Sequence, residues 1–192
     1  KIPRRLAQGY AKFRREQFCS EVERYASVGL NKKSETMIIA CADARVDPAT
    51  VFQTAPGELF VVRNVAALVP PYETVGSYHG TSAAIEFAVK ELAVKSIIVL
   101  GHAQCGGVAA SLKAAQDAKQ PSHFMGPWLA LIDGVRDELF RNRPDETQME
   151  LQRVLEELAV KQSVFNISTF PFVADAVTRG ALEVHGAWLS MG

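Results

Sequence analysis

Apolar residues follow two spacings along this chain. Short apolar runs occupy residues 36–40, 59–63, 96–100 and 182–188, the pattern of buried strands, and a turn at Pro56-Gly57 introduces the second run. Between them, apolar positions three and four residues apart predict helices at residues 81–94, 106–118, 129–140, 146–162 and 171–178. Because strands alternate with helices, we expect an α/β fold with a mainly parallel sheet and right-handed crossovers.

The start of the chain has a different pattern. Residues 3–30 are rich in charge, with apolar side chains at Leu6, Phe13, Phe18, Val22 and Tyr25, and predict a helical arm. We expect one domain over residues 1–192, made of this arm (1–30) and an α/β core (31–192). The apolar face of the arm would be exposed on a monomer, which favours a partner surface.

Composition and charge narrow the classes of partner. A chain of 192 residues with 48% hydrophobic content can bury one sizeable core. Lysine plus arginine and aspartate plus glutamate are balanced at 21 each, so no net charge favours nucleic acid or an anionic membrane. No apolar run approaches the roughly 20 residues of a bilayer span. We therefore expect neither nucleic acid nor a membrane as a partner.

Cysteine usage bears on the compartment. The 3 cysteines are widely spaced, which argues against a disulfide framework and for reducing surroundings. The basic start lacks the apolar segment of a secretory signal. We expect a cytoplasmic protein, although a processed organelle protein would look the same.

Candidate metal ligands follow two of the predicted strands. Cys41 comes directly after the run at 36–40, and His102 and Cys105 follow the run at 96–100. Two thiolates and one imidazole suit zinc, and a set of three leaves one tetrahedral position for water, as in catalytic sites. Open α/β sheets place their sites at the carboxyl ends of strands. The alternative is that the cysteines are small core residues, as buried cysteines usually are.

The neighbours of these ligands favour the metal. Asp43 and Arg45 follow Cys41 at once, and a charged pair beside a buried thiol is unfavourable unless it is used. Gly106-Gly107 lets the chain turn into a helix whose amino end favours thiolates. Cys19 lies in the polar arm without such neighbours, and we expect it to be structural or incidental.

Taken together, these residues resemble the motifs of the β-class carbonic anhydrases. Cys41-x-Asp43-x-Arg45 and His102-x-x-Cys105-Gly-Gly match the two signatures of that family, and residues 56–65 and 80–87 match as well. The resemblance implies a four-stranded sheet of order 2-1-3-4 flanked by helices. It also implies one zinc ion per chain, bound by Cys41, His102 and Cys105, and a homodimer or higher even oligomer with the arm on the partner.

The resemblance implies reversible hydration of carbon dioxide to bicarbonate and a proton. Zinc would lower the pKa of a bound water and provide the attacking hydroxide. Asp43 would accept a hydrogen bond from that hydroxide, and Arg45 would hold the Asp43 carboxylate off the metal. Two other functions stay open: hydrolysis of another small heterocumulene such as carbon disulfide, and a catalytically silent zinc-folded module that binds bicarbonate or a scaffold partner.

The same resemblance implies a substrate pocket. Its members would be Phe60, Val65, Phe87, Gly106 and Lys32, with the first three forming apolar walls for carbon dioxide. Lys32 stands where the family has a glutamine, so an ammonium there would tighten anion binding, unless the neighbouring Asn31 provides the amide instead.

Other positions bear on the subtype and on proton transfer. Ile38 replaces the tryptophan of the bicarbonate-inhibited subtype, and Pro70-Pro71-Tyr72 resembles the plant-like, open-site one. Ala44 and Phe87 depart from the serine and tyrosine usual in the family. Candidate proton shuttles are His79, His123 and His185, for which surface or core roles are the alternative.

Overall fold

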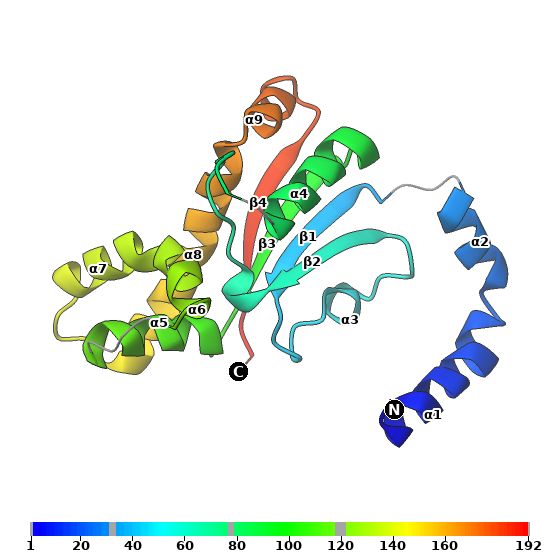
Figure 1. Cartoon of the computed structure of the whole chain (residues 1–192), viewed down its shortest axis with the longest axis horizontal. Coiled ribbons are helices and arrows are strands. Elements are labelled where there is room, and N and C mark those ends of the chain that lie inside the picture. Colours follow the sequence, from blue (N-terminus) through cyan, green and yellow to red (C-terminus); the bar gives the residue numbers. More distant parts are fainter. Residues whose placement is uncertain (1, 31–33, 77–78, 118–121, 192) are drawn as a thin grey trace.

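A parallel sheet of four strands forms the centre of the computed structural model, which describes residues 2–30, 34–76, 79–117 and 122–191. The strands are β1 (Thr36–Cys41), β2 (Leu59–Asn64), β3 (Ser96–His102) and β4 (Glu183–Leu189) (Figure 1). Every neighbouring pair is parallel, and the order is β2-β1-β3-β4. The predicted α/β class, the strand order and all four strands are confirmed.

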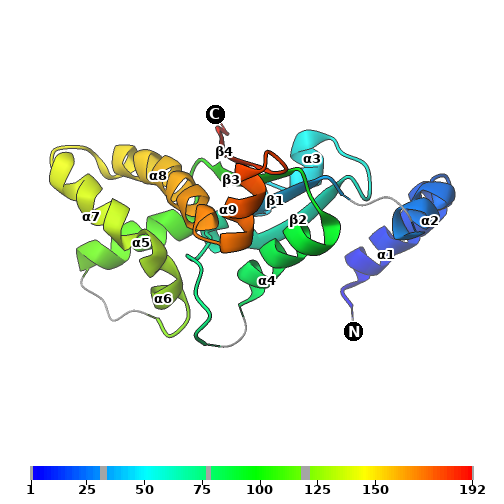
Figure 2. The same cartoon turned by 90° about the horizontal axis from the view of Figure 1, so that it is seen from above.

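Helices cover the sheet unevenly. On one face lie α4 (Gly80–Phe87), α8 (Gln148–Ser168) and α9 (Pro171–Thr178), while the short α3 (Pro48–Phe52) lies on the other (Figure 2). The main core fills the space under α8 and its neighbours, and a smaller cluster of Ile38, Ala40 and Leu100 occupies the opposite face. A side-chain carbon on Gly101 would clash with Val160, so α8 packs directly on β3.

Several helix boundaries differ from the predictions. The predicted helix at 129–140 is divided into α6 (Met125–Leu129), a 3-10 turn (Ala130–Ile132) and α7 (Asp133–Asn142), and α8 continues to Ser168. The predicted helix at 81–94 ends in a π turn (Ala88–Leu92), whereas α5 (Gly106–Asp117) agrees with its prediction.

The prediction missed α3 altogether, together with a 3-10 turn (Val65–Ala67). The Asp47 carboxylate accepts a hydrogen bond from the backbone N–H of Thr50, and Pro48 occupies the first turn. An aspartate followed by proline is a helix-start signal that the sequence contained. This helix is too short to show the apolar periodicity by which longer helices are predicted.

The arm is helical, as predicted, but it is not one helix. It consists of α1 (Arg4–Lys12), a π turn (Phe13–Phe18) and α2 (Val22–Leu30). It stands apart from the sheet and its covering helices (Figures 1 and 2). Contact with the core runs through α2, where Arg24 pairs with Glu58 at 2.9 Å and Val28 lies against Gly57.

Most of the apolar arm side chains have no core to pack on. Phe13, Phe18 and Tyr25 form an aromatic cluster with ring centroids 5.0–6.2 Å apart. Leu6 and Tyr10 on α1 are exposed, and α1 buries none of its residues. No helix in the described residues is long and apolar enough to cross a membrane.

Candidate metal centre

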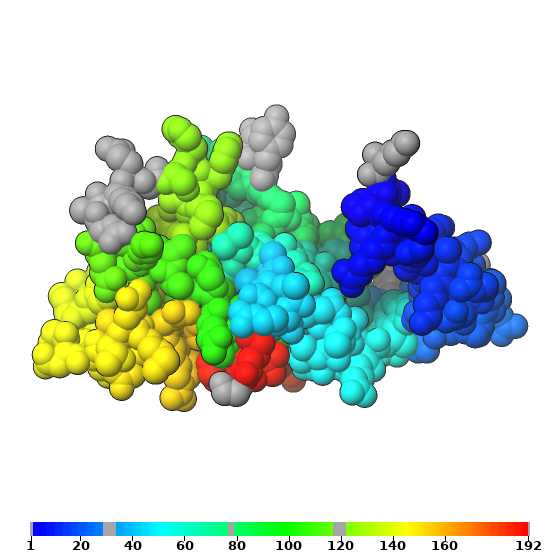
Figure 3. Space-filling model, turned by 90° about the horizontal axis from the view of Figure 1, so that it is seen from below, coloured from blue at the N-terminus to red at the C-terminus, as the bar shows by residue number. Residues whose placement is uncertain are grey.

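Three candidate ligands meet where β1 and β3 end. Cys41 is the last residue of β1, His102 is the last residue of β3, and Cys105 lies three residues later, just before α5. All three are buried, and one ligand atom from each lies within 4.8 Å of the other two. Seen from below, the segments that follow β1 (cyan) and β3 (green) and the end of β4 (red) meet on this side of the molecule (Figure 3). The predicted convergence at the carboxyl ends of the strands is confirmed.

The geometry of these ligands fits zinc. The Cys41 and Cys105 sulfurs are 3.9 Å apart, and both cysteines are free. A tetrahedral zinc with Zn–S bonds of about 2.3 Å would hold two sulfurs roughly 3.8 Å apart. The Nδ1 atom of His102 lies 2.8 Å from the Ala103 carbonyl oxygen, while its Nε2 atom is buried and has no hydrogen-bond partner. That arrangement fixes Nδ1 as the donor and leaves the Nε2 lone pair for a metal.

The pKa values of the three candidate ligands are shifted in different directions. A hydrogen bond from the Cys105 thiol lowers the pKa of Cys41 to about 4, against the opposing effect of burial. The same contact, together with burial, raises the pKa of Cys105 well above its ordinary value. Burial lowers the pKa of His102, but the Cys41 sulfur and the Ala103 carbonyl outweigh it and raise that pKa overall. Zinc binds thiolates and neutral imidazole, so it must displace these protons and binds less tightly as pH falls.

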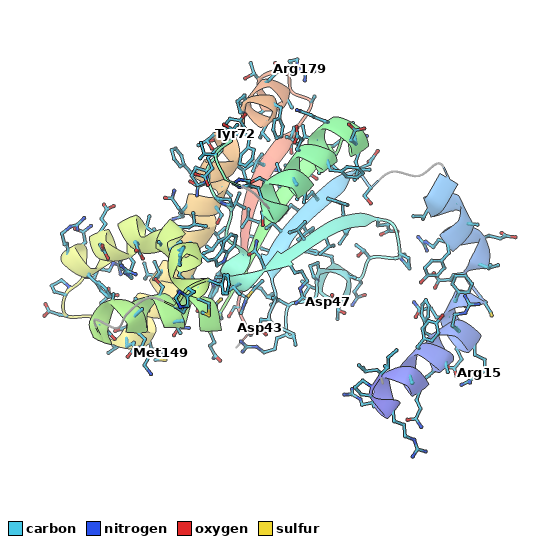
Figure 4. The ribbon with its side chains drawn as sticks, in the orientation of Figure 1. Arg15, Asp43, Asp47, Tyr72, Met149 and Arg179 are labelled. Atoms are coloured by element: carbon cyan, nitrogen blue, oxygen red, sulfur yellow. The ribbon has the colours of Figure 1, made fainter. Side chains whose placement is uncertain are left out.

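Asp43 and Arg45 form a tight pair beside Cys41. The Asp43 Oδ1 atom accepts hydrogen bonds from the Arg45 backbone N–H and from Nε, both at 2.9 Å, and Oδ2 accepts one from Nη2 at 2.8 Å. These hydrogen bonds hold the pKa of Asp43 well below its usual range. Figure 4 shows Asp43 at the lower edge of the sheet.

Asp43 and Arg45 are less buried than the sequence predicted. The side chains of Asp43 and Arg45 are 23% and 46% exposed in the single chain. Desolvation is therefore weak here, and the reasoning that a buried pair must be functional does not hold for the isolated chain. The geometry of the pair, rather than its burial, has to support a role in the site.

Arg45 also joins the two ligand segments. Its Nη2 atom donates to the Gln104 carbonyl oxygen at 3.0 Å, between His102 and Cys105. Gln104 itself has a φ of 56°, the left-handed region that a residue with a side chain seldom adopts. The turn that carries Cys105 is therefore held by a contact from the segment that carries Cys41.

Arg63 on β2 also supports the end of β1, a role that the sequence did not indicate. Its Nε atom donates to the Cys41 carbonyl oxygen at 2.9 Å, and Nη2 donates to the carbonyl oxygen of Asp43. Arg63 lies opposite Ala40 in the register of β1 and β2, so it reaches the end of β1 from the neighbouring strand. The apolar residues of β2 predict the strand itself, but they do not predict its pairing with β1, which brings Arg63 to Cys41.

The expected pocket residues are brought together in two groups. The rings of Phe60 and Phe87 lie 5.8 Å apart, and the Phe87 side chain is 48% exposed. Val65 is 38% exposed and lies against Gly107, where a side-chain carbon would come within 2.8 Å of it. The Trp128 Nε1 atom donates to the Val65 carbonyl oxygen at 2.9 Å, which ties the segment after β2 to α6.

The two remaining residues expected in the pocket are Gly106 and Lys32. Gly106 is exposed as the first residue of α5, with no heavy atom within 4 Å of where a side-chain carbon would stand. Lys32 lies outside the described residues, as does Asn31.

The candidate shuttle histidines lie in different places. His185 on β4 pairs with Glu183 at 3.0 Å and stands opposite Ile98, four residues before the metal end of β3. At about 3.3 Å per residue, that is roughly 13 Å from His102 along the sheet. His79 and His123 line a cavity of about 480 Å³ that also contacts Trp128.

Known proteins are similar to this chain in sequence. The sequence model of the carbonic anhydrase family matches residues 36–192. Beta carbonic anhydrase 6, mitochondrial, of Arabidopsis thaliana is 34% identical over 185 residues, which cover 95% of this chain and 62% of that protein. The chain thus spans less than two thirds of the length of this relative.

Solved structures extend the likeness to the whole fold. The β-carbonic anhydrase CcaA matches with a TM-score of 0.89 and 29% identity, over 97% of this chain and 82% of that one. The Coccomyxa enzyme in complex with acetazolamide has a TM-score of 0.84 and 29% identity, over 99% and 83%. A tetrameric enzyme of Sordaria macrospora has a TM-score of 0.83 and 26% identity, over 96% and 89%.

The family model, the sequence relative and the solved structures therefore agree with one another over most of the chain. Because the match extends over residues 36–192 and solved β-carbonic anhydrases share the overall fold, the chain belongs to the carbonic anhydrase family, in its β class, whose metal is zinc.

Proposed function

We propose that this protein catalyses the reversible hydration of carbon dioxide to bicarbonate and a proton. The observation that carries the proposal is a set of three buried zinc ligands, one short of a tetrahedron, followed two residues after Cys41 by a carboxylate that Arg45 grips. A structural zinc site would be closed by a fourth protein ligand and would have no need of such a carboxylate.

Each residue has a defined task in this proposal. Cys41, His102 and Cys105 would hold one zinc ion, which would supply a water acidic enough to ionise near neutral pH and so the nucleophile for carbon dioxide. Asp43 would accept a hydrogen bond from the attacking water or hydroxide and so orient its lone pair. Arg45 engages both oxygens of Asp43, which keeps the carboxylate ionised and away from the metal.

The substrate pocket and the subtype belong to the same proposal. Phe60, Val65 and Phe87 provide apolar walls for a small apolar substrate, and Gly106 leaves room at the start of α5. The pairing of Asp43 with Arg45 and the presence of Ile38 on β1 support the open-site subtype, in which Asp43 would stay bound to Arg45 and would not be a metal ligand.

Stopped-flow measurement of carbon dioxide hydration by the purified protein tests this proposal. We expect catalysis that rises between about pH 6 and pH 9, because the nucleophilic water must ionise. Asp43 is ionised throughout this range, since its pKa is held below the usual value, and it does not produce the rise. A flat pH profile would contradict the mechanism.

Zinc analysis and a carbon disulfide assay on the same purified protein separate the alternative functions. A zinc-loaded protein without hydration activity would favour the silent module that binds bicarbonate or a scaffold partner. Turnover of carbon disulfide in place of carbon dioxide would favour the other hydrolase.

We propose that the active form is a homodimer or a higher even oligomer. The exposed apolar side chains of α1 and the exposure of Val65 and Phe87 support a partner surface, and the Sordaria macrospora relatives are tetrameric. Sedimentation should show at least a dimer, and replacing Leu6 and Tyr10 together by serine should weaken it. Gln8→Ser on the same helix is the control. A wild-type monomer at micromolar concentration would contradict this assembly.

The remaining proposals concern organisation and compartment. We propose that residues 1–192 act as one domain, with the arm (1–30) serving assembly and the core (31–192) serving catalysis. Both thiol ligands must stay reduced, which suits the cytoplasm and equally the interior of an organelle. Fractionation of the source cells decides between them.

A further inference from the structure

The zinc ligand Cys105 is tied to α8 through its backbone. Its N–H donates to the Oε1 atom of Glu156 at 2.8 Å, and the Gln152 Nε2 atom donates to the same Oε1 at 3.0 Å. The Gln152 Nε2 atom also lies 3.4 Å from the Cys105 carbonyl oxygen. We propose that Glu156, supported by Gln152, is a positioning residue that sets where the Cys105 sulfur meets the zinc.

The burial of Glu156 argues against a chance contact between its carboxylate and Cys105. It is 3% exposed, and it is the one acidic residue among the buried residues of the described part of the chain. Its neighbours on α8, Leu155 and Ala159, belong to the apolar core. A carboxylate in such surroundings is unfavourable unless hydrogen bonds satisfy it. Here one donor is the N–H of Cys105, and the other is the Gln152 amide, which also contacts the Cys105 carbonyl oxygen.

The turn needs support from outside because its own conformation is strained. Gln104 adopts the left-handed region, a conformation that persists only where the surroundings hold it. Arg45 holds the Gln104 carbonyl from the side of β1, and Glu156 holds the next N–H from the side of α8. Loss of the second contact would let the turn relax and move the Cys105 sulfur away from its position 3.9 Å from that of Cys41.

The inference rests on zinc binding by Cys105 and not on the reaction that the zinc serves. It is therefore tested by metal retention, which does not require carbon dioxide. Hydrogen bonds that hold a metal ligand in position typically contribute about 10–100-fold to metal affinity.

Two substitutions separate hydrogen bonding from mere packing. Glu156→Leu removes the acceptor and fills the space, so that water from the adjoining cavity of about 560 Å³ does not replace it. Glu156→Gln keeps a carbonyl oxygen for the Cys105 N–H. Glu157→Leu is the matched control, because Glu157 is the next residue on α8 and lines a separate groove with Val160 and Trp188.

The measurement is the rate at which each zinc-loaded protein loses its metal to excess chelator. We expect about 10–100-fold faster loss from Glu156→Leu, and rates close to wild type for Glu156→Gln and Glu157→Leu. The absorption bands of the cobalt-substituted proteins should change in Glu156→Leu alone, since they report the geometry of the thiolate ligands.

Several results would overturn the inference. Equal zinc-loss rates for folded Glu156→Leu and Glu157→Leu would show that Glu156 only stabilises the fold. Equally fast loss from Glu156→Gln and Glu156→Leu would contradict the acceptor role. If Glu156→Leu does not fold, Gln152→Leu takes its place, with a smaller shift expected in the same direction and an unchanged rate overturning the inference. A wild-type protein that holds zinc without hydrating carbon dioxide would overturn the proposed function and leave this test intact.

Discussion

Replacing Asp43 with alanine is expected to leave zinc bound and to lower kcat/KM for carbon dioxide hydration by about 100-fold or more. Arg45→Ala should have a similar effect. The reason is that neither side chain is a metal ligand, whereas the hydrogen bonds from the Arg45 backbone N–H, Nε and Nη2 hold the Asp43 carboxylate in one orientation. Stopped-flow kinetics and metal analysis of the same samples provide both values.

The structure offers a matched control for this prediction. Asp175 on α9 forms an exposed pair with Arg179, the residue that follows this helix, and Arg179 lies far above Asp43 in Figure 4. Asp175→Ala should keep wild-type kinetics. Turnover close to wild type in Asp43→Ala or Arg45→Ala would show that their pair is only structural, as surface ion pairs often are.

The acid stability of this pair follows from the lowered pKa of Asp43. A carboxyl group with a depressed pKa in the folded protein contributes stability at pH values above its unfolded pKa. That contribution is lost as pH falls through the depressed value. Any loss of activity near neutral pH must therefore come from another group.

Replacing Cys105 with serine is expected to remove most of the zinc and, with it, the activity. A serine hydroxyl is a far weaker zinc ligand than a thiolate, and only Cys41 and His102 would remain. Metal analysis after dialysis should give much less than one zinc per chain. The loss should be greater at lower pH, because protons compete for the remaining ligands.

Cys19→Ser is the control for this substitution. Cys19 is exposed in the arm, and its thiol donates to the Arg14 carbonyl oxygen at 3.0 Å, so the variant should keep its zinc. Full zinc occupancy in Cys105→Ser would refute the ligand assignment.

Periodicity and ligand chemistry account for most of what could be predicted. Each strand was placed within one or two residues, because a buried strand needs an unbroken apolar run whatever its neighbours are. The two motifs located Cys41, His102 and Cys105, since thiol and imidazole groups after strand ends are unusual enough to stand out. Helix ends were less accurate, and α3 was missed, because short capped helices have little periodicity.

Contacts between distant segments were beyond the sequence. Glu156 looked like one more polar position of a helix, and its hydrogen bond to Cys105 spans 51 residues. Arg63 reaches Cys41 only because β2 pairs with β1 in one particular register. The partial exposure of Asp43 and Arg45 likewise depends on how other elements surround them.

Residue types at short spacing thus specify the four strands, most of the helices and the chemistry of the metal ligands, because these features depend on neighbours close in the sequence. How the ligand turn is held, through Arg45 from one side and Glu156 from the other, follows from packing between distant segments. A hydrogen bond is satisfied by whichever group the packing brings within about 3 Å, and local sequence does not specify that group.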